Sequence, residues 1–424
     1  MRLISSTLIN TIFWGLPLSL LHVLFNKLNL HGLNIFIPPT FLILMVLSIS
    51  YKKLWSFEMF KVKKIRLRFV TFALLFYLVS LYVSSIVYRA RALHTHFLQH
   101  NRGWIGVVHQ ADTLLGFKPI PNSRGFHTFP VGEDIPMAYD QNGFRVALSD
   151  TLKEDSEIDI LFLGCSFTYG DACLAEHTFP YLTAKKLNKT YINAGVCSYG
   201  LTQMVLLSEK LIPKYNPKYV VIQHSSWLVE RGTSLFAPVY YGSLPNPYFV
   251  EREGKMDIHP PIYISQIFGL NPEIIKSQSL LIFFINTGFK FYVIEDARYI
   301  SLIWEKITHK IDKPTMHLKE AEMFGYKKII ETAEKYGAYP IILHIDSKNK
   351  NLSLDEIIKY PNAKVVDTDI ELTDYLSHTK SHSFSKEFEH WRIVDHDSVL
   401  VDRHPNFASH SIIAHALIQA INHH

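Results

Sequence analysis

The chain has 424 residues, and its formal net charge of +5, from 43 basic and 38 acidic residues, is too small to indicate nucleic-acid binding. Its hydrophobic content of 48% and its positive mean hydropathy are high for a soluble protein. The length accommodates a membrane segment with one large domain, or two soluble domains, and a sizeable core in either case.

Three long apolar runs precede any sign of a soluble domain. They cover residues 4–25, 31–50 and 69–88. Each run is long enough to cross a hydrocarbon core of about 30 Å at about 1.5 Å per residue. We therefore expect residues 1–90 to form a membrane anchor of about three transmembrane helices, of which the second is interrupted by Pro38 and Pro39. The alternative is a set of buried helices in a soluble protein.

A cluster of basic residues between the second and third runs predicts the orientation of this anchor. The cluster consists of Lys52, Lys53, Lys61, Lys63, Lys64, Arg66 and Arg68. Positively charged loops stay in the cytoplasm, so the chain after about residue 90 is expected on the other side, although Arg89 and Arg91 oppose this rule. In a bacterial inner membrane, the bulk of the protein would then lie in the periplasm.

Residues 91–157 have the pattern of a lead-in or linker with short β segments. Alternating apolar residues are broken by Pro, Asn and Gly, as in the stretch that follows Gly116 and the stretch that ends at Arg145. Such breaks are typical of short strands and turns rather than helices.

From residue 158 onward, short apolar runs alternate with longer helical stretches. Strands are expected at 158–163, 191–193, 218–223, 339–345 and 363–366, and helices near 178–188, 201–212, 318–336 and 408–421. This alternation predicts right-handed crossovers and a parallel sheet with helices on both faces, that is, a three-layer α/β/α domain over 158–424.

A long insertion, at about 228–317, separates the third expected strand from the helix at 318–336. Its most apolar part, Leu280 to Ile294, is too short to span a membrane comfortably and contains Lys290. A core helix or cap is the simpler interpretation. An interfacial helix or a wall for an acyl chain is the alternative.

Ser166 stands at a position where open α/β sheets bind their ligands. It follows the first expected strand in the sequence Gly164-Cys165-Ser166, at the carboxyl end of that strand. A serine becomes a nucleophile only when a base lies nearby. Alone, Ser166 could equally be the N-cap of a helix.

Asp402 and His404 supply a candidate base and its partner. A neutral His accepts the serine proton and later returns it, and a carboxylate on its other nitrogen fixes the tautomer. Two residues apart in a loop, the two side chains can project toward one site. The alternative is a surface turn in which Pro405 begins the closing helix.

A turn of small residues after the second strand, Asn193 to Gly200, offers backbone donors. The N–H of Gly195 could join the N–H of Ser166 in holding a developing oxyanion, because glycine lets the backbone approach a ligand closely. An ordinary strand-to-helix turn explains the same residues.

Taken together, three motifs resemble those of the SGNH/GDSL hydrolase superfamily over roughly residues 158–424. They read G-x-S-F-T-Y-G, N-A-G-x-x-S-Y-G-L-T-Q and D-x-H-P-N. The resemblance implies a flavodoxin-like α/β/α fold and no cofactor or metal. It further implies a nucleophile at Ser166, a base at His404, an orienting carboxylate at Asp402, and oxyanion donors at the backbones of Ser166 and Gly195.

The chain departs from this family pattern in two places. Cys165 replaces the acidic residue of Gly-Asp-Ser, and a cysteine nucleophile at this position is a minor alternative. After the third strand, the family's G-x-N-D is replaced by Gln223-His-Ser-Ser-Trp227, so the third oxyanion donor is missing. A hydroxyl of Ser225 or Ser226, the Trp227 indole, or His224 could replace it.

We expect a membrane-anchored serine esterase that acts on O-acyl groups of an envelope glycan or lipid outside the cytoplasm. An O-acyltransferase that modifies a cell-surface polysaccharide through the same three residues is the first alternative, and it would require an acyl-donor membrane protein as a partner. A non-catalytic envelope binding module is the second. The three cysteines, Cys165, Cys173 and Cys197, have no zinc-site spacing, and we expect free buried thiols rather than a disulfide.

Overall fold

A computed structural model of the chain describes most residues from 79 onward. The described ranges are 79–95, 103–105, 108–129, 131–149, 157–239, 242–270, 275, 277–308, 312–345, 362–379 and 382–423. The predicted spans at 4–25 and 31–50, and the start of the third, therefore lie outside the described residues. In the part of the chain that is described, no helix combines the length and apolar character needed to cross a membrane.

Five parallel strands form the central sheet, in the order β15–β14–β9–β7–β8. Their bounds are β7 (Ile160–Leu163), β8 (Tyr191–Asn193), β9 (Tyr219–His224), β14 (Tyr339–His344) and β15 (Lys364–Asp367). In chain order this is 2-1-3-4-5, the flavodoxin-like arrangement, whose ligand-binding switch point lies between the first and third strands. The parallel sheet predicted from the sequence is confirmed.

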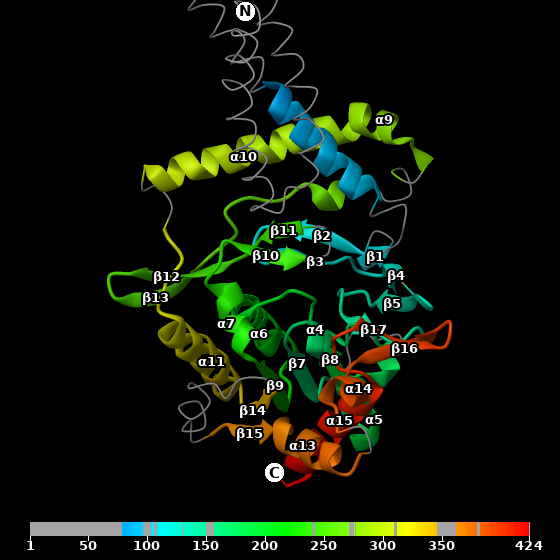
Figure 1. The fold of residues 1–424 in the computed structure, drawn as a ribbon. Helices are drawn as coiled ribbons and strands as arrows, with labels where there is room; N and C mark the ends of the chain where they lie inside the picture. Colours follow the sequence, from blue (N-terminus) through cyan, green and yellow to red (C-terminus); the bar gives the residue numbers. More distant parts are fainter. Residues whose placement is uncertain are drawn as a thin grey trace, which may run out of the picture. The chain divides into compact units, whose positions relative to one another are not determined.

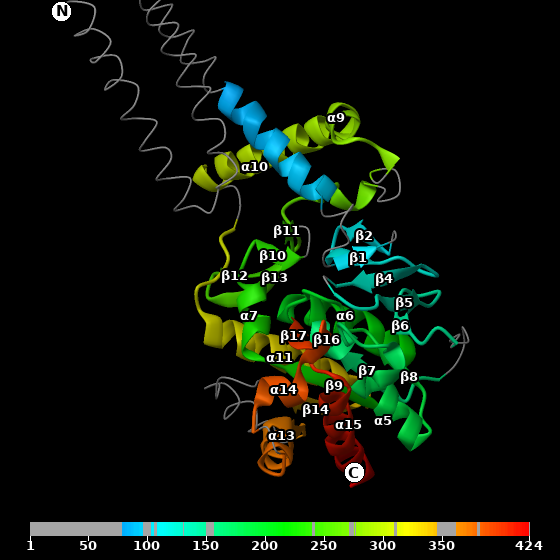
Figure 2. The ribbon, with the colours of Figure 1, turned by 45° about the vertical axis from the view of Figure 1, so that its right-hand side comes forward.

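Helices cover both faces of this sheet (Figures 1 and 2). They are α5 (Phe179–Leu187), α6 (Leu201–Tyr215), α11 (Leu318–Lys335) and α15 (Phe407–Asn422). Alternate residues of β7 face opposite layers: Leu161 and Leu163 join the core under α6 and α11, and Ile160 and Phe162 join the core under α5 and α15. Four consecutive apolar residues are therefore needed in this strand, which is buried on both sides.

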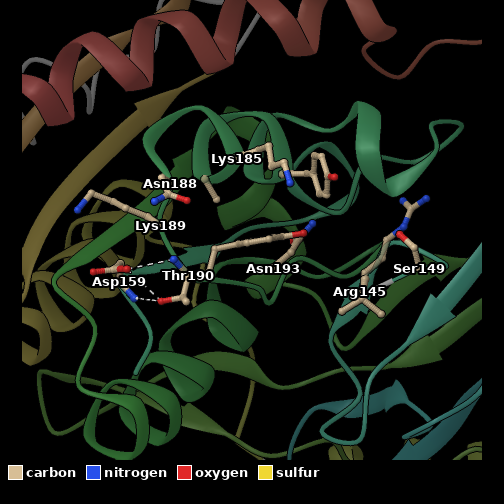
Figure 3. Close-up of a pocket in the computed structure, with 12 residues that line it drawn as sticks. Arg145, Ser149, Asp159, Lys185, Asn188, Lys189, Thr190 and Asn193 are labelled. Atoms are coloured by element: carbon tan, nitrogen blue, oxygen red, sulfur yellow. Dashed lines mark hydrogen bonds between the residues drawn. The ribbon is translucent and has the colours of Figure 1, made fainter. Parts of the chain in front are cut away.

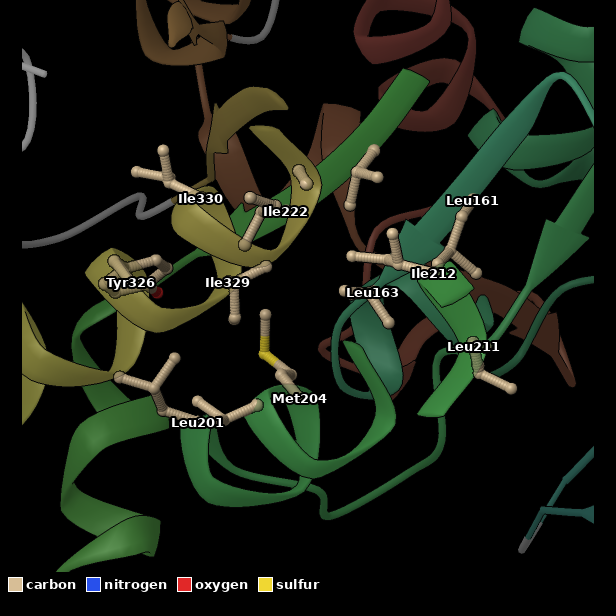
Figure 4. Packing of buried hydrophobic residues seen from close by; sticks show 14 of the residues in the cluster. Leu161, Leu163, Leu201, Met204, Leu211, Ile212, Ile222, Tyr326, Ile329 and Ile330 are labelled. Carbon is tan, nitrogen blue, oxygen red and sulfur yellow. The ribbon is translucent and has the colours of Figure 1, made fainter. Parts of the chain in front are cut away.

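The core under α6 and α11 is built from aliphatic side chains that interdigitate (Figure 4). Figure 4 shows Leu201 and Met204 of α6 reaching toward Ile329 of α11. Each fully buried side chain of this size stabilises the fold by about 1.5–3 kcal/mol. Gly325 of α11 allows the close packing, since a Cβ there would lie 2.6 Å from the side chain of Leu201.

The lead-in is a set of short antiparallel strands, as predicted. They are β1 (Gly103–Ile105), β2 (His109–Asp112), β3 (Gly116–Pro119), β4 (Arg124–Thr128), β5 (Ile135–Tyr139) and β6 (Arg145–Val146). Strands β1, β4, β5 and β6 form one sheet, and β2 pairs with β3 in a hairpin. By its contacts, this region belongs to the same compact unit as the parallel sheet.

The insertion contains two hairpins and then a long helical segment. The hairpins are β10 (Phe236–Val239) with β11 (Gly242–Pro245), and β12 (Tyr248–Arg252) with β13 (Lys255–His259). They are preceded by α7 (Ser226–Gly232). The sequence interpretation did not include these hairpins.

The apolar stretch from Leu280 is helical throughout. It runs from α9 (Leu280–Phe283) through a π-helical turn at Phe284–Gly288 into α10 (Phe289–Ile307). Phe283 is buried, but 66% of Leu281 and 64% of Ile285 are exposed, so this is not a fully buried core helix. Helix 79–95 and Gln278–Ile294 form a compact unit of their own, in which His94 contacts the backbone oxygen of Gln278 at 2.9 Å.

The C-terminal part adds α13 (Thr368–Ser377), α14 (Phe384–Phe388) and the hairpin of β16 (His390–Val394) and β17 (Asp397–Asp402). Strand β17 ends at Asp402, two residues before the candidate base His404. All three cysteines are free and buried, which confirms the prediction of free thiols.

Candidate active site

Ser166 begins a one-turn helix at the carboxyl end of β7. Helix α4 (Ser166–Tyr169) follows Gly164 and Cys165, and the N–H of its first residue is among those with no partner inside the helix. A Cβ at Gly164 would lie 2.0 Å from Thr168 Oγ1 and 2.5 Å from Gln223 Oε1, so only glycine fits there. The chain therefore turns sharply and leaves Ser166 at the switch point of the sheet.

Asp402 holds His404 through two contacts. His404 Nδ1 lies 2.5 Å from Asp402 Oδ1, and the His404 backbone N–H donates to the same oxygen at 2.7 Å. Burial alone would raise the pKa of Asp402, but the hydrogen bonds from His404 outweigh it and bring the pKa to about 2. Asp402 therefore stays ionised, and places the proton of a neutral His404 on Nδ1.

His404 lies beside the turn that carries Ser166. The rings of His404 and Phe167 are 5.6 Å apart between centroids, and Phe167 also packs on Trp227 at 5.1 Å. The Ser166 hydroxyl donates to Cys165 Sγ at 3.8 Å, and not to His404. Bonds between a nucleophile and its base are often long or misaligned before substrate binds.

A second carboxylate, Asp171, faces the other nitrogen of His404. Asp171 Oδ2 lies 3.7 Å from His404 Nε2, accepts a hydrogen bond from the Cys197 thiol at 3.0 Å, and belongs to a fully buried side chain. His127 Nδ1 lies 3.0 Å from Asp171 Oδ1. Burial would raise the pKa of Asp171, but the nearby imidazoles of His127 and His404 hold it well below its usual range.

The two carboxylates together favour the charged form of His404. Burial lowers the pKa of His404, but the hydrogen bond to Asp402 and the charge of Asp171 outweigh burial, so the pKa is raised. Sequence reasoning missed Asp171 and His127, since neither lies in the motifs that carried the resemblance. The only local signal was a carboxylate directly after Gly170, one residue beyond the G-x-S-F-T-Y-G motif.

The lead-in strands support this loop from one side. Arg145 of β6 donates to the carbonyls of Tyr169, Gly170 and Cys173, at 2.8 Å and 2.6 Å for the first two. His127 comes from β4 of the same region. The region predicted as a linker thus contributes buried side chains to the candidate site.

Not all predicted oxyanion donors are available in this geometry. The Gly195 N–H donates to Asn193 Oδ1 at 3.1 Å. Contrary to the prediction, Ser225 has no proton to offer, because its buried hydroxyl donates to the carbonyl of Ile345 at 2.7 Å. Ser226 is the half-buried first residue of α7, and the Ser166 N–H remains a candidate donor.

Gln223, which stands in the departure from the family motif, holds the turn before Ser166. Its Oε1 accepts from the Cys165 N–H at 3.0 Å and from Thr168 Oγ1 at 2.8 Å, and its Nε2 donates to Ser225 Oγ at 2.9 Å. The same amide group contacts Cys165 Sγ at 3.2 Å. Gln223 therefore stabilises the turn that carries Ser166, and its side-chain amide is engaged in these hydrogen bonds.

The other two substitutes considered for the missing donor are occupied as well. His224 is fully buried, with Nδ1 2.9 Å from His344 Nδ1. The Trp227 indole is hydrogen-bonded to the Cys165 thiol. Burial would raise the pKa of that thiol, but the charge of Arg231 and hydrogen bonds, including the one from Trp227, lower it. The thiol is fully buried, as expected for a side chain that points away from the site.

A cavity of about 570 Å³ lies along the edge strand β8 (Figure 3). Figure 3 shows Lys185 of α5, Asn188 just after α5 and Asn193 of β8 around it, and Ser166, Asp402 and His404 are not part of its lining. A second cavity of about 400 Å³ is lined by neighbours of Asp171 and His404, among them Ala172 and Asn406. Within the described ranges, the one His and Asp group with the spacing of a metal site does not include the three candidate catalytic residues.

No family model and no curated protein sequence matches this chain. Solved structures that match it include a lipolytic protein of the G-D-S-L family from Desulfitobacterium hafniense DCB-2, with 11% identity, a TM-score of 0.31, and coverage of 62% of this chain and 98% of the other. A GDSL-like lipase from Bacteroides thetaiotaomicron VPI-5482 has 11% identity, a TM-score of 0.32, and coverage of 64% and 92%.

A third match is an acetyl xylan esterase from the rumen bacterium Butyrivibrio proteoclasticus. Its identity is 10%, its TM-score is 0.32, and the alignment covers 76% of this chain and 83% of the other. At these values, the function has to be argued from the site itself.

Proposed function

We propose that the protein is a serine esterase with Ser166 as nucleophile, His404 as general base and Asp402 as the carboxylate that orients it. One observation carries the proposal: His404, held by Asp402 at 2.5 Å, packs on the residue after Ser166 at the switch point of a 2-1-3-4-5 sheet. These residues come from sequence positions more than 230 apart.

The reaction follows an acyl-enzyme cycle. Ser166 Oγ attacks the ester carbonyl while its proton passes to His404 Nε2, and the tetrahedral intermediate then collapses as His404 returns that proton to the leaving alcohol. Water, deprotonated by His404, next attacks the acyl-serine ester, and the acid leaves as the proton returns to Ser166. Asp402 stays ionised throughout and stabilises the imidazolium that forms in each half-reaction.

Asp171 imposes a condition on this cycle. His404 accepts a proton only as a neutral imidazole with Nε2 directed at Ser166, whereas Nε2 now faces Asp171 at 3.7 Å and the pKa of His404 is raised. A shift of the imidazole from Asp171 to Ser166 on substrate binding would complete the site. Activity should therefore increase with pH as His404 loses its proton.

The oxyanion would be held by the Ser166 N–H. The Gly195 N–H could join it after release from Asn193. Because each donor in such a site is worth about 10²–10³ in rate, a hole with fewer donors predicts a slower hydrolase than one with three.

For the substrate we propose O-acyl groups of an envelope glycan or lipid, with the enzyme anchored in a bacterial inner membrane and the site in the periplasm. The support is the charge pattern of the sequence, in which a basic cluster lies between the second and third apolar runs. A carboxyl-terminal alkaline phosphatase fusion tests this placement: it should be active, and an inactive fusion would contradict it.

Acyl transfer to a sugar hydroxyl is the second candidate, since the same acyl-serine intermediate serves both reactions. A binding module is the third, favoured by the lack of a Ser166–His404 hydrogen bond and by the occupied hydroxyl of Ser225. Hydrolysis of p-nitrophenyl acetate by full-length protein and by Ser166→Ala decides between enzyme and module. Turnover that depends on Ser166 supports the enzyme, and equal rates for the two proteins support the module.

A further inference from the structure

Three neighbouring strands end in ionisable side chains at the same edge of the sheet. β9 ends at His224, β14 at His344 and β15 at Asp367, and the strand register places His344 opposite both of the others. Asp369 follows in the first turn of α13. Ligands of open α/β proteins bind at this carboxyl edge, yet none of these four residues has a role in the proposed hydrolysis.

Contacts behind His344 fix the position of its ring. His344 Nδ1 lies 2.9 Å from Nδ1 of the fully buried His224, and His224 Nε2 lies 3.3 Å from Glu322 Oε1. His344 Nδ1 is therefore engaged with His224, and Nε2 is the nitrogen on the side of Asp369.

Two carboxyl groups lie on the Nε2 side of His344. His344 Nε2 lies 3.8 Å from Asp369 Oδ2, and one ligand atom each of His344, Asp367 and Asp369 lie within 4.8 Å of one another. Two carboxylates this close repel each other, and a cation bound between them would relieve the repulsion.

His344 lies at the closed side of this group, and the two carboxyl groups lie at its open side. His344 is buried, whereas Asp367 and Asp369 are half-buried and so can be reached from solvent. Asp367 Oδ1 accepts the N–H of Asp369 at 3.1 Å, which orients its carboxyl group at the start of α13. Bonds of about 2.0–2.2 Å place ligand atoms of one ion roughly 3–3.5 Å apart, so the carboxyl groups need to close by about 1 Å.

We propose that His344, Asp367 and Asp369 bind one divalent transition-metal ion, Zn²⁺ or Mn²⁺, with water in the remaining positions. One imidazole nitrogen with two carboxylates suits these ions better than Cu(I), which prefers thiolate and thioether. His224 and Glu322 form the outer layer that orients the ligating His344, as carboxylates and other acceptors do behind metal-bound histidines. The ion would join α13 to the ends of β14 and β15.

Equilibrium dialysis of full-length, tag-free, chelator-treated protein against Zn²⁺ and against Mn²⁺, followed by metal analysis, tests the proposal. One ion per chain is expected. His344→Ala and Asp369→Asn should each weaken binding at least tenfold, and His224→Phe, which removes the outer layer, by about 10–100-fold. Asp374→Asn is the matched control, because it removes an exposed carboxylate from the same helix and should leave affinity unchanged.

Thermal unfolding of the same proteins gives a second readout. An ion that binds only the folded state raises the melting temperature of the wild type, and Asp369→Asn should abolish this increase. Asp369 is half-buried, so this variant decides the matter even where His344→Ala fails to fold. No stoichiometric uptake of either ion by the wild type, or equal uptake by Asp369→Asn and Asp374→Asn, would overturn the proposal.

Discussion

Two groups of ionisable residues lie at the carboxyl edge of one sheet, and they differ in what surrounds them. At β7, Ser166 and His404 have few direct bonds, and His404 is 19% exposed. At β9 and β14, His224 and His344 are almost fully buried and bond directly to each other. The first group can rearrange when a substrate arrives. The second is fixed by the contact between the two rings and lies beside Asp367 and Asp369.

The two groups differ in how firmly neighbouring residues hold the histidine. His404 stands between two carboxylates and can respond to either, which suits a group that accepts and returns a proton. His224 stands between Glu322, at 3.3 Å, and His344, at 2.9 Å, in a fully buried position. Variants around His404 should change the activity, whereas the variant beside His224 should change the free energy of unfolding.

The largest effect on activity, after loss of Ser166 itself, is expected from Asp402→Asn. The amide cannot stabilise the imidazolium and favours the wrong tautomer of His404, so kcat/KM for p-nitrophenyl acetate should fall by about 10⁴-fold. An activity loss below tenfold would remove Asp402 from the proposed triad.

Gln223→Leu should affect both activity and stability. It leaves the Cys165 N–H and the hydroxyls of Thr168 and Ser225 with fewer partners, at about 1–3 kcal/mol for each buried group left unsatisfied. Urea unfolding measures the loss. Gln419→Leu, on the exposed side of α15, is the control and should stay within about 0.5 kcal/mol of the wild type.

Glu322→Ala should lower the free energy of unfolding by about 1–3 kcal/mol without lowering kcat, because it removes the carboxylate 3.3 Å from the buried His224 ring, remote from the chemistry. Glu331→Ala removes an exposed carboxylate from the same helix and should have little effect. Equal losses in the two variants would show that the Glu322–His224 contact contributes nothing measurable.

The smallest expected effect is a shift in the pH profile of Asp171→Asn. The negative charge of Asp171 favours the imidazolium form of His404, so its removal lowers the pKa of His404. The rising limb of kcat/KM should then move to lower pH. If the rising limb of kcat/KM stays at the same pH, or moves to higher pH, Asp171 does not raise the pKa of His404.

The elements of the parallel sheet could be predicted almost residue by residue. The expected strand at 191–193 coincides with β8, and the expected helix at 318–336 ends one residue beyond α11. Periodicity of apolar residues carries this information, because both faces of each strand must be buried. Ser166, Asp402 and His404 were predicted differently, from their place after strands and in motifs, and their roles stay predictions.

The rest depended on contacts between distant segments. The bond between His224 and His344 spans 120 residues, and the contact of His127 with Asp171 joins the lead-in to the nucleophile loop. The donor role considered for Ser225 failed because the carbonyl of Ile345, from the end of another strand, takes its proton. No local sequence pattern predicts such contacts, since each depends on how the strands are ordered in space.

The most direct test of the account is labelling of the full-length protein with a fluorophosphonate, followed by peptide mass spectrometry. The account predicts one adduct, on Ser166, formed faster as the pH rises and His404 becomes neutral, and absent in Ser166→Ala. Slow labelling is also expected in Asp402→Asn. An adduct on another residue, or no adduct on Ser166 in active protein, would contradict the assignment of Ser166 and His404 as nucleophile and base.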